Sequence, residues 1–227
     1  MMSPPSPPPG TPVRLASRVT ANEPVSATSC LMSLDRCGLA FRAGHEILLH
    51  GRDHTEDRQY SIASGEADAP LQILYRVIPE GVMSPRLAAM RPGDAVEFTG
   101  PIGSFLIRDF LAPIVFIATG TGIAPAVSFV RSFPELNITI LHGVRGAEDL
   151  FGRELFAGRP YFPCVSGRPE PGFFHGRVTD FLPGFELPEE AQVYLCGANA
   201  MILAVRKQLK QRGLPDSRIC SEAYYFW

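Results

Sequence analysis

Residues 58–64 read RQYSIAS and combine a cation, an aromatic ring and hydroxyl groups within one strand-length segment. Side chains on a strand alternate between two faces, so Arg58, Tyr60 and Ser64 would share one face. A guanidinium beside an aromatic ring suits a ligand that carries both phosphates and a flat heterocycle. Taken alone, however, this stretch is better explained as an ordinary barrel strand with a surface arginine.

Residues 119–125 read TGTGIAP and form a glycine-rich turn between an apolar strand and a helix. Gly120 and Gly122 have no Cβ atom, so the backbone can turn sharply and approach a ligand closely. Backbone N–H groups at the start of the following helix would then offer a site for a pyrophosphate. The spacing is not GxGxxG, and a tight strand–helix turn explains it about equally well.

Two further glycine turns lie between these stretches. In EGVMSPRLAAMRPGD, residues 80–94, Gly81 opens a turn before a predicted helix over 84–90, with Ser84 as N-cap and Pro85 at the first helical position. The free N–H groups of that helix could hold another phosphate. GPIGSF at 100–105 is the other turn, and a simple hairpin corner is its alternative explanation.

The segment VYLCGANAM, residues 193–201, places Cys196 and Gly197 at the carboxyl end of a predicted parallel strand. Ligands of open α/β sheets bind at such strand ends. The alternative is that Cys196 is only a small buried apolar residue.

The composition excludes several classes of protein. The chain has 227 residues and a formal net charge of -2, so it has no general attraction to nucleic acid or anionic membranes. Its five cysteines are widely spaced without a CxxC pair, which argues against a disulfide framework and against a zinc or iron–sulfur site, so no metal is expected. No stretch approaches the length of a membrane span, and the N-terminus lacks signal-peptide features. We therefore expect a cytoplasmic protein.

The pattern of elements changes near residues 111–113. Residues 1–12 are Pro-rich and predict a disordered tail. Residues 13–111 predict an antiparallel β-barrel, because strand-like segments alternate with Gly and Pro turns. Residues 112–227 predict an α/β, doubly wound parallel sheet, because strands alternate with helices. The expected strands are 13–20, 46–51, 58–64, 71–78, 94–100, 114–119, 137–143 and 192–197, and the expected helices of the second domain are 126–133, 147–156 and 198–213.

In this order, the motifs resemble those of the ferredoxin–NADP reductase family of flavoenzymes. The resemblance runs from residue 13 onward and is greatest to the bacterial single-component branch. The matching segments are RQYSIAS at 58–64, GVMSPRL at 81–87, GPIGSF at 100–105, TGTGIAP at 119–125, YLCGANAM at 194–201 and EAY at 222–224.

The resemblance implies that the barrel binds FAD. Arg58 would pair with the pyrophosphate, and Tyr60 would lie against the flavin. Ser61 would form a hydrogen bond near flavin N5, although strict alternation places it on the face opposite Tyr60. Tyr224 would cover the apolar face of the flavin ring. The implied FAD-binding residues are Arg58, Tyr60, Ser61, Ser64, Gly81, Val82, Met83, Ser84, Tyr224 and Trp227.

The resemblance also implies that the second domain binds NADP(H). Cys196 would position the nicotinamide, and Glu222 would be a proton or polarity partner, so the implied catalytic residues are Ser61, Cys196 and Glu222. The implied dinucleotide-binding residues are Thr119, Gly120, Thr121, Gly122, Arg145, Arg168, Arg177, Cys196 and Gly197. NADPH is favoured over NADH because the three arginines could bind a 2′-phosphate. Against this, HGRV also occurs in NADH-using relatives, and surface arginines are common.

The expected activity is that of an FAD-dependent oxidoreductase. It would transfer hydride between NADPH and flavin, and single electrons between flavin and ferredoxin or flavodoxin. No iron–sulfur domain is expected in the chain, so the partner would be a separate protein, and we expect a monomer. One alternative is an NADH-dependent reductase that serves an oxygenase, a cytochrome or ferric compounds. Another is a nucleotide-binding module without activity, which the presence of Ser61, Cys196 and Glu222 disfavours. The segment GHEI, residues 44–47, departs from the family's G-Q-F and could alter the acceptor side.

Overall fold

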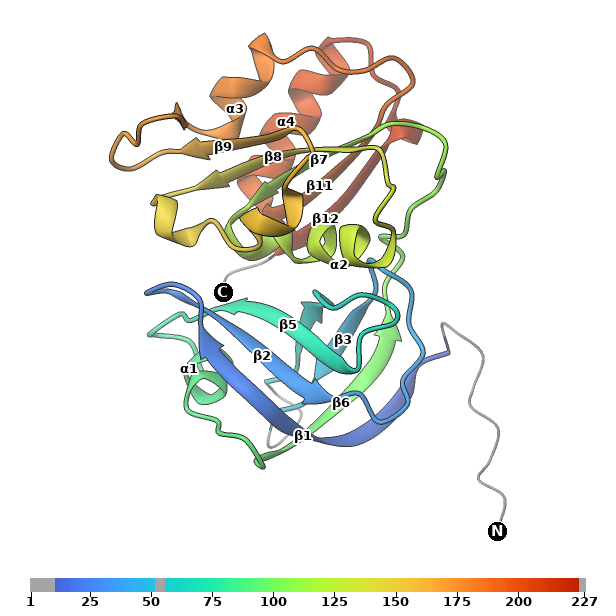
Figure 1. Ribbon diagram of the computed structural model, residues 1–227, viewed down its shortest axis with the longest axis vertical. Coiled ribbons are helices and arrows are strands. Elements are labelled where there is room, and N and C mark those ends of the chain that lie inside the picture. Colours follow the sequence, from blue (N-terminus) through green and yellow to red (C-terminus); the bar gives the residue numbers. More distant parts are fainter. Residues whose placement is uncertain (1–10, 52–55, 225–227) are drawn as a thin grey trace. The chain divides into compact units, whose positions relative to one another are not determined.

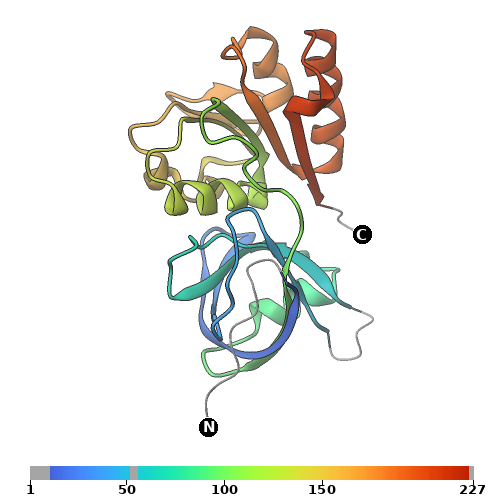
Figure 2. The ribbon, with the colours of Figure 1, turned by 90° about the vertical axis from the view of Figure 1, so that its right-hand side faces the viewer.

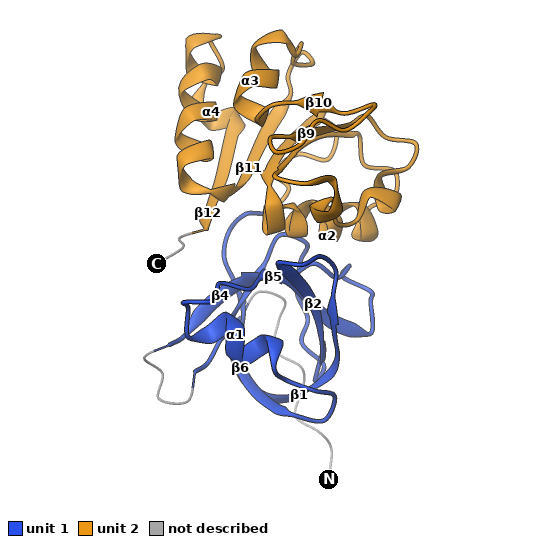
Figure 3. Cartoon of the chain, turned by 90° about the vertical axis from the view of Figure 1, so that its left-hand side faces the viewer, with its two compact units in different colours: residues 1–106 blue, residues 107–227 orange. Residues whose placement is uncertain are grey.

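The structure is a computed structural model that describes residues 11–51 and 56–224. The chain forms two compact units, Met1–Leu106 and Ile107–Trp227, coloured separately in Figure 3. The first is an antiparallel barrel and the second is built on a parallel sheet, so the predicted fold class is confirmed. The predicted disordered tail falls mainly on residues 1–10, which lie outside the described residues, as does Trp227.

Six strands form the barrel in the order β4-β3-β6-β1-β2-β5. The two ends of this sheet meet where Ile62 bridges Ile73 and the Ala63 N–H donates to the Gln72 carbonyl at 2.8 Å, and Figure 2 shows the strands curving into a ring. Closure pairs the edge strands and leaves an interior that apolar side chains fill. The strands are β1 (Val13–Pro24), β2 (Ser29–Asp35), β3 (Glu46–Leu49), β4 (Arg58–Ser61), β5 (Pro70–Arg76) and β6 (Ala95–Ile102).

Helix α1 (Met83–Ala88) packs against the barrel and begins earlier than predicted. Its N-cap is Val82, so the prediction that Ser84 caps the helix is wrong. The Ser84 hydroxyl instead accepts a hydrogen bond from the Ile78 N–H at 2.9 Å. This bond closes the turn that leads into the helix, and a local backbone partner of this kind competes with capping.

The second unit contains a six-stranded parallel sheet in the order β10-β9-β8-β7-β11-β12. Figure 1 shows α2 on one face of this sheet and α3 and α4 on the other. The chain runs outward from β7 to β10 and then returns to β11, so the carboxyl ends of β7 and β11 form the topological switch point. The strands are β7 (Ile114–Thr119), β8 (Ile138–Val144), β9 (Tyr161–Val165), β10 (Phe174–His175), β11 (Gln192–Ala198) and β12 (Ile219–Tyr224). The helices are α2 (Ala124–Ser132), α3 (Val178–Phe181) and α4 (Asn199–Gln211), and the 3₁₀ helices are η1 (Gly120–Ile123), η2 (Ala147–Asp149), η3 (Arg153–Phe156), η4 (Leu182–Gly184) and η5 (Asp216–Arg218).

The predicted helix over 147–156 is wrong, because this segment forms the two short helices η2 and η3. Gly152 separates them with a φ of 73°, a left-handed conformation that interrupts a helix. Strands β2, β9, β10 and β12 were not predicted. Within the part of the chain that the structure describes, no helix has the length and apolar character needed to cross a membrane.

Candidate coenzyme sites

Strand β4 carries the cation and the ring that the sequence singled out for FAD. Arg58 is exposed, and its Nη1 donates to the Asp57 carbonyl at 2.9 Å. Tyr60 is half-buried against the barrel core, and its ring meets Tyr75 edge-on with the centroids 6.3 Å apart. Burial raises the pKa of Tyr60 and outweighs the opposing effect of Arg58, so its hydroxyl stays protonated. The strand therefore offers an exposed guanidinium and a neutral phenol ring.

Ser61 ends β4 and is buried opposite Glu46 of β3. Glu46 is only 8% exposed, and its Oε2 lies 3.4 Å from the position of a Cβ at Gly103. From the sequence, residues 44–47 stand out only as a departure from the family's G-Q-F, and Glu46 receives no role. Burying a carboxylate costs free energy unless it has polar partners. A glutamate inside a predicted barrel strand was therefore the sequence signal that could have identified Glu46.

The strand alternation expected over 58–64 does not continue to Ser64. Regular pairing with β3 ends at Ser61, and the chain then crosses to β5. Ser64 is fully buried, and its hydroxyl accepts the Gln72 N–H at 3.0 Å. This hydroxyl therefore helps to close the barrel, and Ser64 does not lie beside the exposed Arg58.

The segment that begins α1 belongs to the same hydrophobic cluster as Tyr60, through Met83. The Tyr75 hydroxyl donates to Asn22 Oδ1 at 3.0 Å, and Asn22 Nδ2 donates to the Leu87 carbonyl of α1 at 2.8 Å. These bonds fix the helix relative to the strands. The barrel thus brings the two predicted FAD segments, 58–61 and 81–84, into one body, and their cation, ring and backbone N–H groups fit the phosphates and ring of FAD.

The glycine turn of the second unit packs directly on the end of β11. A Cβ at Gly122 would lie 2.4 Å from the Cys196 carbonyl oxygen, so only glycine permits this approach. The Ala198 N–H donates to Thr119 Oγ1 at 3.0 Å and joins the two strand ends. Gly120 has a φ of 52°, and apart from its chain neighbours and its own helix no described atom lies within 4 Å of its Cβ position. The switch point therefore carries a glycine cradle that faces open space, which fits a pyrophosphate.

Cys196 and Glu222 lie opposite each other on β11 and β12. Cys196 is buried, and its Sγ donates to Glu222 Oε1 at 3.7 Å. Tyr224 ends β12 opposite Ala198. All five cysteines are free thiols, and the described residues include no group of three or more His, Cys, Asp or Glu that could hold a metal ion. The arrangement places a thiol and a carboxylate at the strand ends beside the glycine turn.

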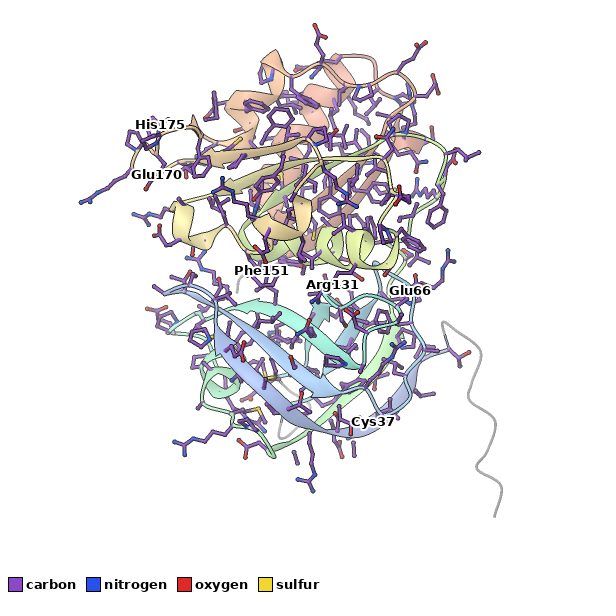
Figure 4. All side chains as sticks on the ribbon, viewed as in Figure 1. Cys37, Glu66, Arg131, Phe151, Glu170 and His175 are labelled. Atoms are coloured by element: carbon purple, nitrogen blue, oxygen red, sulfur yellow. The ribbon has the colours of Figure 1, made fainter. Side chains whose placement is uncertain are left out.

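Arg145, Arg168 and Arg177 follow β8, β9 and β10 at the carboxyl edge of the same sheet, and all three are exposed. The Gly167 N–H donates to the Arg145 carbonyl at 2.8 Å, so the segments that carry Arg145 and Arg168 lie together. His175, labelled in Figure 4, marks the strand that leads to Arg177. Arg145 follows β8, which is the second strand of the parallel sheet in chain order. Dinucleotide-binding sheets place the residue that contacts the 2′ position of the adenosine ribose after this strand.

His142 of β8 is a fully buried residue that belongs to none of the motifs recognised in the sequence. Its Nε2 lies 2.9 Å from the Gly120 carbonyl oxygen, and its Nδ1 lies 3.0 Å from the Tyr161 hydroxyl. Burial lowers the pKa of His142 to about 4, so the imidazole is neutral at pH 7. A histidine inside a strand buried on both faces was the sequence signal, because such a side chain must find partners.

We expect the free energy of unfolding to fall as the pH is lowered from 7 toward 4. The pKa of His142 is 6.5 in the unfolded chain and about 4 in the fold, so between these values only the unfolded chain takes up the proton. The loss contributed by this one group is about 3 kcal/mol at pH 4. Thermal unfolding of the whole chain between pH 7.5 and about 4 measures this loss. His142→Gln should show a shallower pH dependence, and an unchanged slope would contradict the assignment.

Comparisons with known proteins bear on both units. The family model for the oxidoreductase FAD-binding domain matches residues 13–107, and that for the oxidoreductase NAD-binding domain matches residues 116–207. The reductase subunit of an aromatic O-demethylase from Amycolatopsis sp. is 34% identical over 205 residues, which cover 82% of this chain and 61% of that protein. The electron transfer component of anthranilate 1,2-dioxygenase from Acinetobacter baylyi is 31% identical, and the match covers 95% of this chain and 68% of that protein.

Solved structures show the same arrangement of elements. The crystal structure of an Amycolatopsis cytochrome P450 reductase matches with a TM-score of 0.85 and 31% identity, over 94% of this chain and 70% of that chain. A ferredoxin NADP+ reductase from Neisseria gonorrhoeae has the same fold, with a TM-score of 0.83 at 20% identity over 93% of this chain and 99% of that chain.

The fold and the two sites define an oxidoreductase whose cofactors are FAD and a nicotinamide dinucleotide. The chain belongs to the ferredoxin–NADP reductase family. It spans 61% and 59% of the lengths of two of its curated relatives, the O-demethylase reductase subunit and the toluate 1,2-dioxygenase electron transfer component of Pseudomonas putida.

Proposed function

We propose that this protein takes hydride from NADPH and delivers single electrons to a separate ferredoxin or flavodoxin. The observation that carries the proposal is the switch-point site, where the glycine cradle, the Cys196 thiol and the Glu222 carboxylate meet at neighbouring strand ends. FAD, when bound, accepts hydride from the dinucleotide and releases its electrons one at a time. The chain's own residues supply binding, orientation and proton placement.

The barrel residues hold and orient the flavin coenzyme. The exposed Arg58 guanidinium pairs with the pyrophosphate, assisted by the backbone of residues 81–84. Tyr60 packs against the flavin, and the buried Ser61 hydroxyl hydrogen-bonds near N5. Tyr224 is the residue assigned to the apolar ring face, and Trp227, also assigned to FAD, lies outside the described residues. These roles are those that the family resemblance implies, and the chemistry of the residues is compatible with them.

The residues of the second unit hold the dinucleotide. Thr119, Gly120, Thr121 and Gly122 cradle its pyrophosphate, with Gly197 packed beside them. Cys196 positions the nicotinamide ring, and Glu222, which accepts the Cys196 thiol hydrogen bond at 3.7 Å, holds a proton or stabilises charge near that ring. Both groups act by placement, because the cofactors carry the chemistry.

Changing both Arg145 and Arg168 to alanine should weaken NADPH binding by about 10- to 100-fold, because charge-assisted bonds to the 2′-phosphate are lost. NADH binding should change far less, since NADH has no phosphate at that position. Coenzyme titrations of the oxidised protein measure both affinities. Arg218→Ala is the control, because this surface arginine pairs with Glu190 at 3.5 Å. Equal losses for NADPH and NADH would show that the two arginines do not read the 2′-phosphate.

A second candidate is a reductase that serves an oxygenase or cytochrome system and uses NADH. The relatives favour it, because they include the O-demethylase reductase subunit and the electron transfer components of two dioxygenases. The relative from Ralstonia, 32% identical, is named as a ferredoxin–NAD(P)(+) reductase component of naphthalene 1,2-dioxygenase and salicylate 5-hydroxylase systems. That name combines ferredoxin reduction, from the first candidate, with service to an oxygenase system, from the second.

An anaerobic electron-transfer assay separates these candidates. The reduced holoprotein would be mixed in turn with a ferredoxin, a flavodoxin and a purified oxygenase component, and the rate of acceptor reduction followed by stopped flow. We expect ferredoxin or flavodoxin to be reduced fastest, with NADPH as the better donor. Fastest reduction of the oxygenase component, with NADH as the better donor, would favour the second candidate instead.

A further inference from the structure

The Gly120 carbonyl of the glycine turn is held by two buried side chains of the parallel sheet. His142 is fully buried on β8, and its Nε2 lies 2.9 Å from the Gly120 oxygen. Tyr161, the first residue of β9, places its hydroxyl 3.0 Å from His142 Nδ1. The bond from His142 spans 22 residues and the bond from Tyr161 spans 19, so the contact joins three separate segments.

The direction of each hydrogen bond follows from chemistry. A carbonyl oxygen only accepts, so the hydrogen between His142 and Gly120 must lie on Nε2. In a neutral imidazole Nδ1 then carries a lone pair, and the Tyr161 hydroxyl must donate to it. Burial raises the pKa of Tyr161, so this hydroxyl keeps its proton at neutral pH. Tyr161 therefore donates a hydrogen bond to His142, and His142 donates one to the Gly120 carbonyl.

Gly120 is the first residue of the short 3₁₀ helix η1, and the bond from His142 holds its carbonyl from outside that helix. Its φ of 52° is a conformation that glycine adopts without a Cβ penalty, and apart from its chain neighbours and its own helix no described atom lies within 4 Å of its Cβ position. Without the bond from His142, only this short helix would hold the Gly120–Thr121 peptide, which would then have more freedom to reorient. Such freedom lowers affinity, because a ligand must then order the turn when it binds.

Fixing this carbonyl also fixes the neighbouring donor. The carbonyl of Gly120 and the N–H of Thr121 belong to one planar trans peptide and point in opposite directions. With the carbonyl directed into the sheet at His142, the Thr121 N–H points away from the buried imidazole. We propose that the His142–Tyr161 pair is a positioning device for the dinucleotide turn, which locks the Gly120–Thr121 peptide in the orientation that presents this N–H to a coenzyme phosphate.

The anchoring of Tyr161 supports this role. Its ring stacks on the buried Phe156 with the centroids 5.2 Å apart and an interplanar angle of 25°. It also pairs with Ile140 in the β8–β9 ladder. The hydroxyl therefore has a fixed position from which to set the His142 tautomer. This inference rests on the proposed function, because that function assigns the turn to the dinucleotide.

Three variants of the whole FAD-loaded protein test the proposal. His142→Leu removes the donor to Gly120, Tyr161→Phe removes only the hydroxyl that orients the imidazole, and His142→Gln restores an N–H donor. Oxidised protein would be titrated with NADP+ and NAD+ separately by calorimetry. We expect the dissociation constants to rise about tenfold for His142→Leu and a few-fold for Tyr161→Phe, with partial recovery in His142→Gln. FAD content should stay at the parent level.

Tyr194→Phe is the matched control for lost stability. Tyr194 is fully buried in β11 of the same sheet, and its hydroxyl accepts the Arg108 N–H at 3.0 Å and donates to Gln192 Oε1 at 3.2 Å. Its removal should lower the melting temperature without changing dinucleotide affinity. If Tyr161→Phe and His142→Gln bind as tightly as Tyr194→Phe, the pair is only structural and the proposal is overturned. If His142→Leu does not fold, those two variants still decide the question.

The parent titration separates this inference from the proposed function. A parent that binds neither NADP+ nor NAD+ contradicts the proposed function and the inference with it. A parent that binds one of them, with variants of unchanged affinity, contradicts the inference alone. A spectrum of protein labelled with ¹⁵N-histidine gives an independent check, because the His142 ring must appear as the neutral Nε2–H form.

Discussion

Arg58→Ala should be purified with much less FAD than the parent protein. Its guanidinium is exposed on β4, and the only hydrogen bond that the structure records for it among the described residues is the 2.9 Å contact with the Asp57 carbonyl. A charge-assisted bond to a phosphate contributes about 1.5–3 kcal/mol, so FAD affinity should fall by about 10- to 100-fold. The ratio of visible to ultraviolet absorbance after purification, followed by a titration with added FAD, measures the loss.

Arg18→Ala is the matched control for Arg58→Ala. Arg18 is another exposed arginine of the barrel, and its Nη1 donates to the Gly93 carbonyl at 2.7 Å. Arg18→Ala removes one cation and one hydrogen bond to a carbonyl, as Arg58→Ala does. Because Arg18 is not assigned to FAD, the FAD content should not change. If Arg58→Ala retains as much FAD as Arg18→Ala, the assignment of Arg58 to the pyrophosphate is wrong.

Cys196→Ala should slow reduction of the bound flavin by about 10- to 100-fold, because small errors in the placement of reacting groups cost that much. Cys196 lies near the carboxyl end of β11, where its backbone carbonyl packs against Gly122 and its thiol donates to Glu222 Oε1 at 3.7 Å. FAD content should remain normal, since Cys196 is not among the residues assigned to FAD and Arg58, Tyr60 and Ser61 of the barrel are unchanged. Stopped-flow measurement of flavin reduction by NADPH gives the rate.

Cys164→Ala controls for the loss of a buried thiol from the same sheet. Cys164 is fully buried on β9, where burial raises its pKa to about 12 and leaves it a neutral, packed side chain. Both substitutions create a similar small cavity, but only one should change the rate. Equal reduction rates in Cys196→Ala and the parent would return Cys196 to the role of an ordinary core residue.

The elements that the sequence predicted well are those whose signals are local. The apolar run of β7 and the glycines that follow it define a strand and a turn within a few residues, and the structure places both at the switch point. Strand β9 was missed because Pro163 removes a backbone donor and argues against a strand. In the structure Pro163 pairs with His142 in a parallel ladder, which depends on a segment about twenty residues away.

The site residues that the sequence missed depend on distant partners in the same way. His142 gains its proposed role from Tyr161 on β9 and from the Gly120 turn, and Glu46 comes to lie opposite Ser61 only through the pairing of β3 with β4. A sequence shows that such polar residues sit in strands, but not which groups the fold brings to them. Ser84 is the opposite case, since a serine at this position is typical of a helix N-cap. In the structure its hydroxyl instead accepts a hydrogen bond from the Ile78 N–H.

The central claim is that one chain binds FAD and a nicotinamide dinucleotide and passes hydride between them. An anaerobic titration of the purified protein with NADPH, followed by its visible spectrum, tests this most directly. We predict a yellow protein whose flavin absorbance is bleached by a stoichiometric amount of NADPH. A protein that holds no flavin after incubation with FAD, or one whose flavin neither NADPH nor NADH bleaches, would contradict the account.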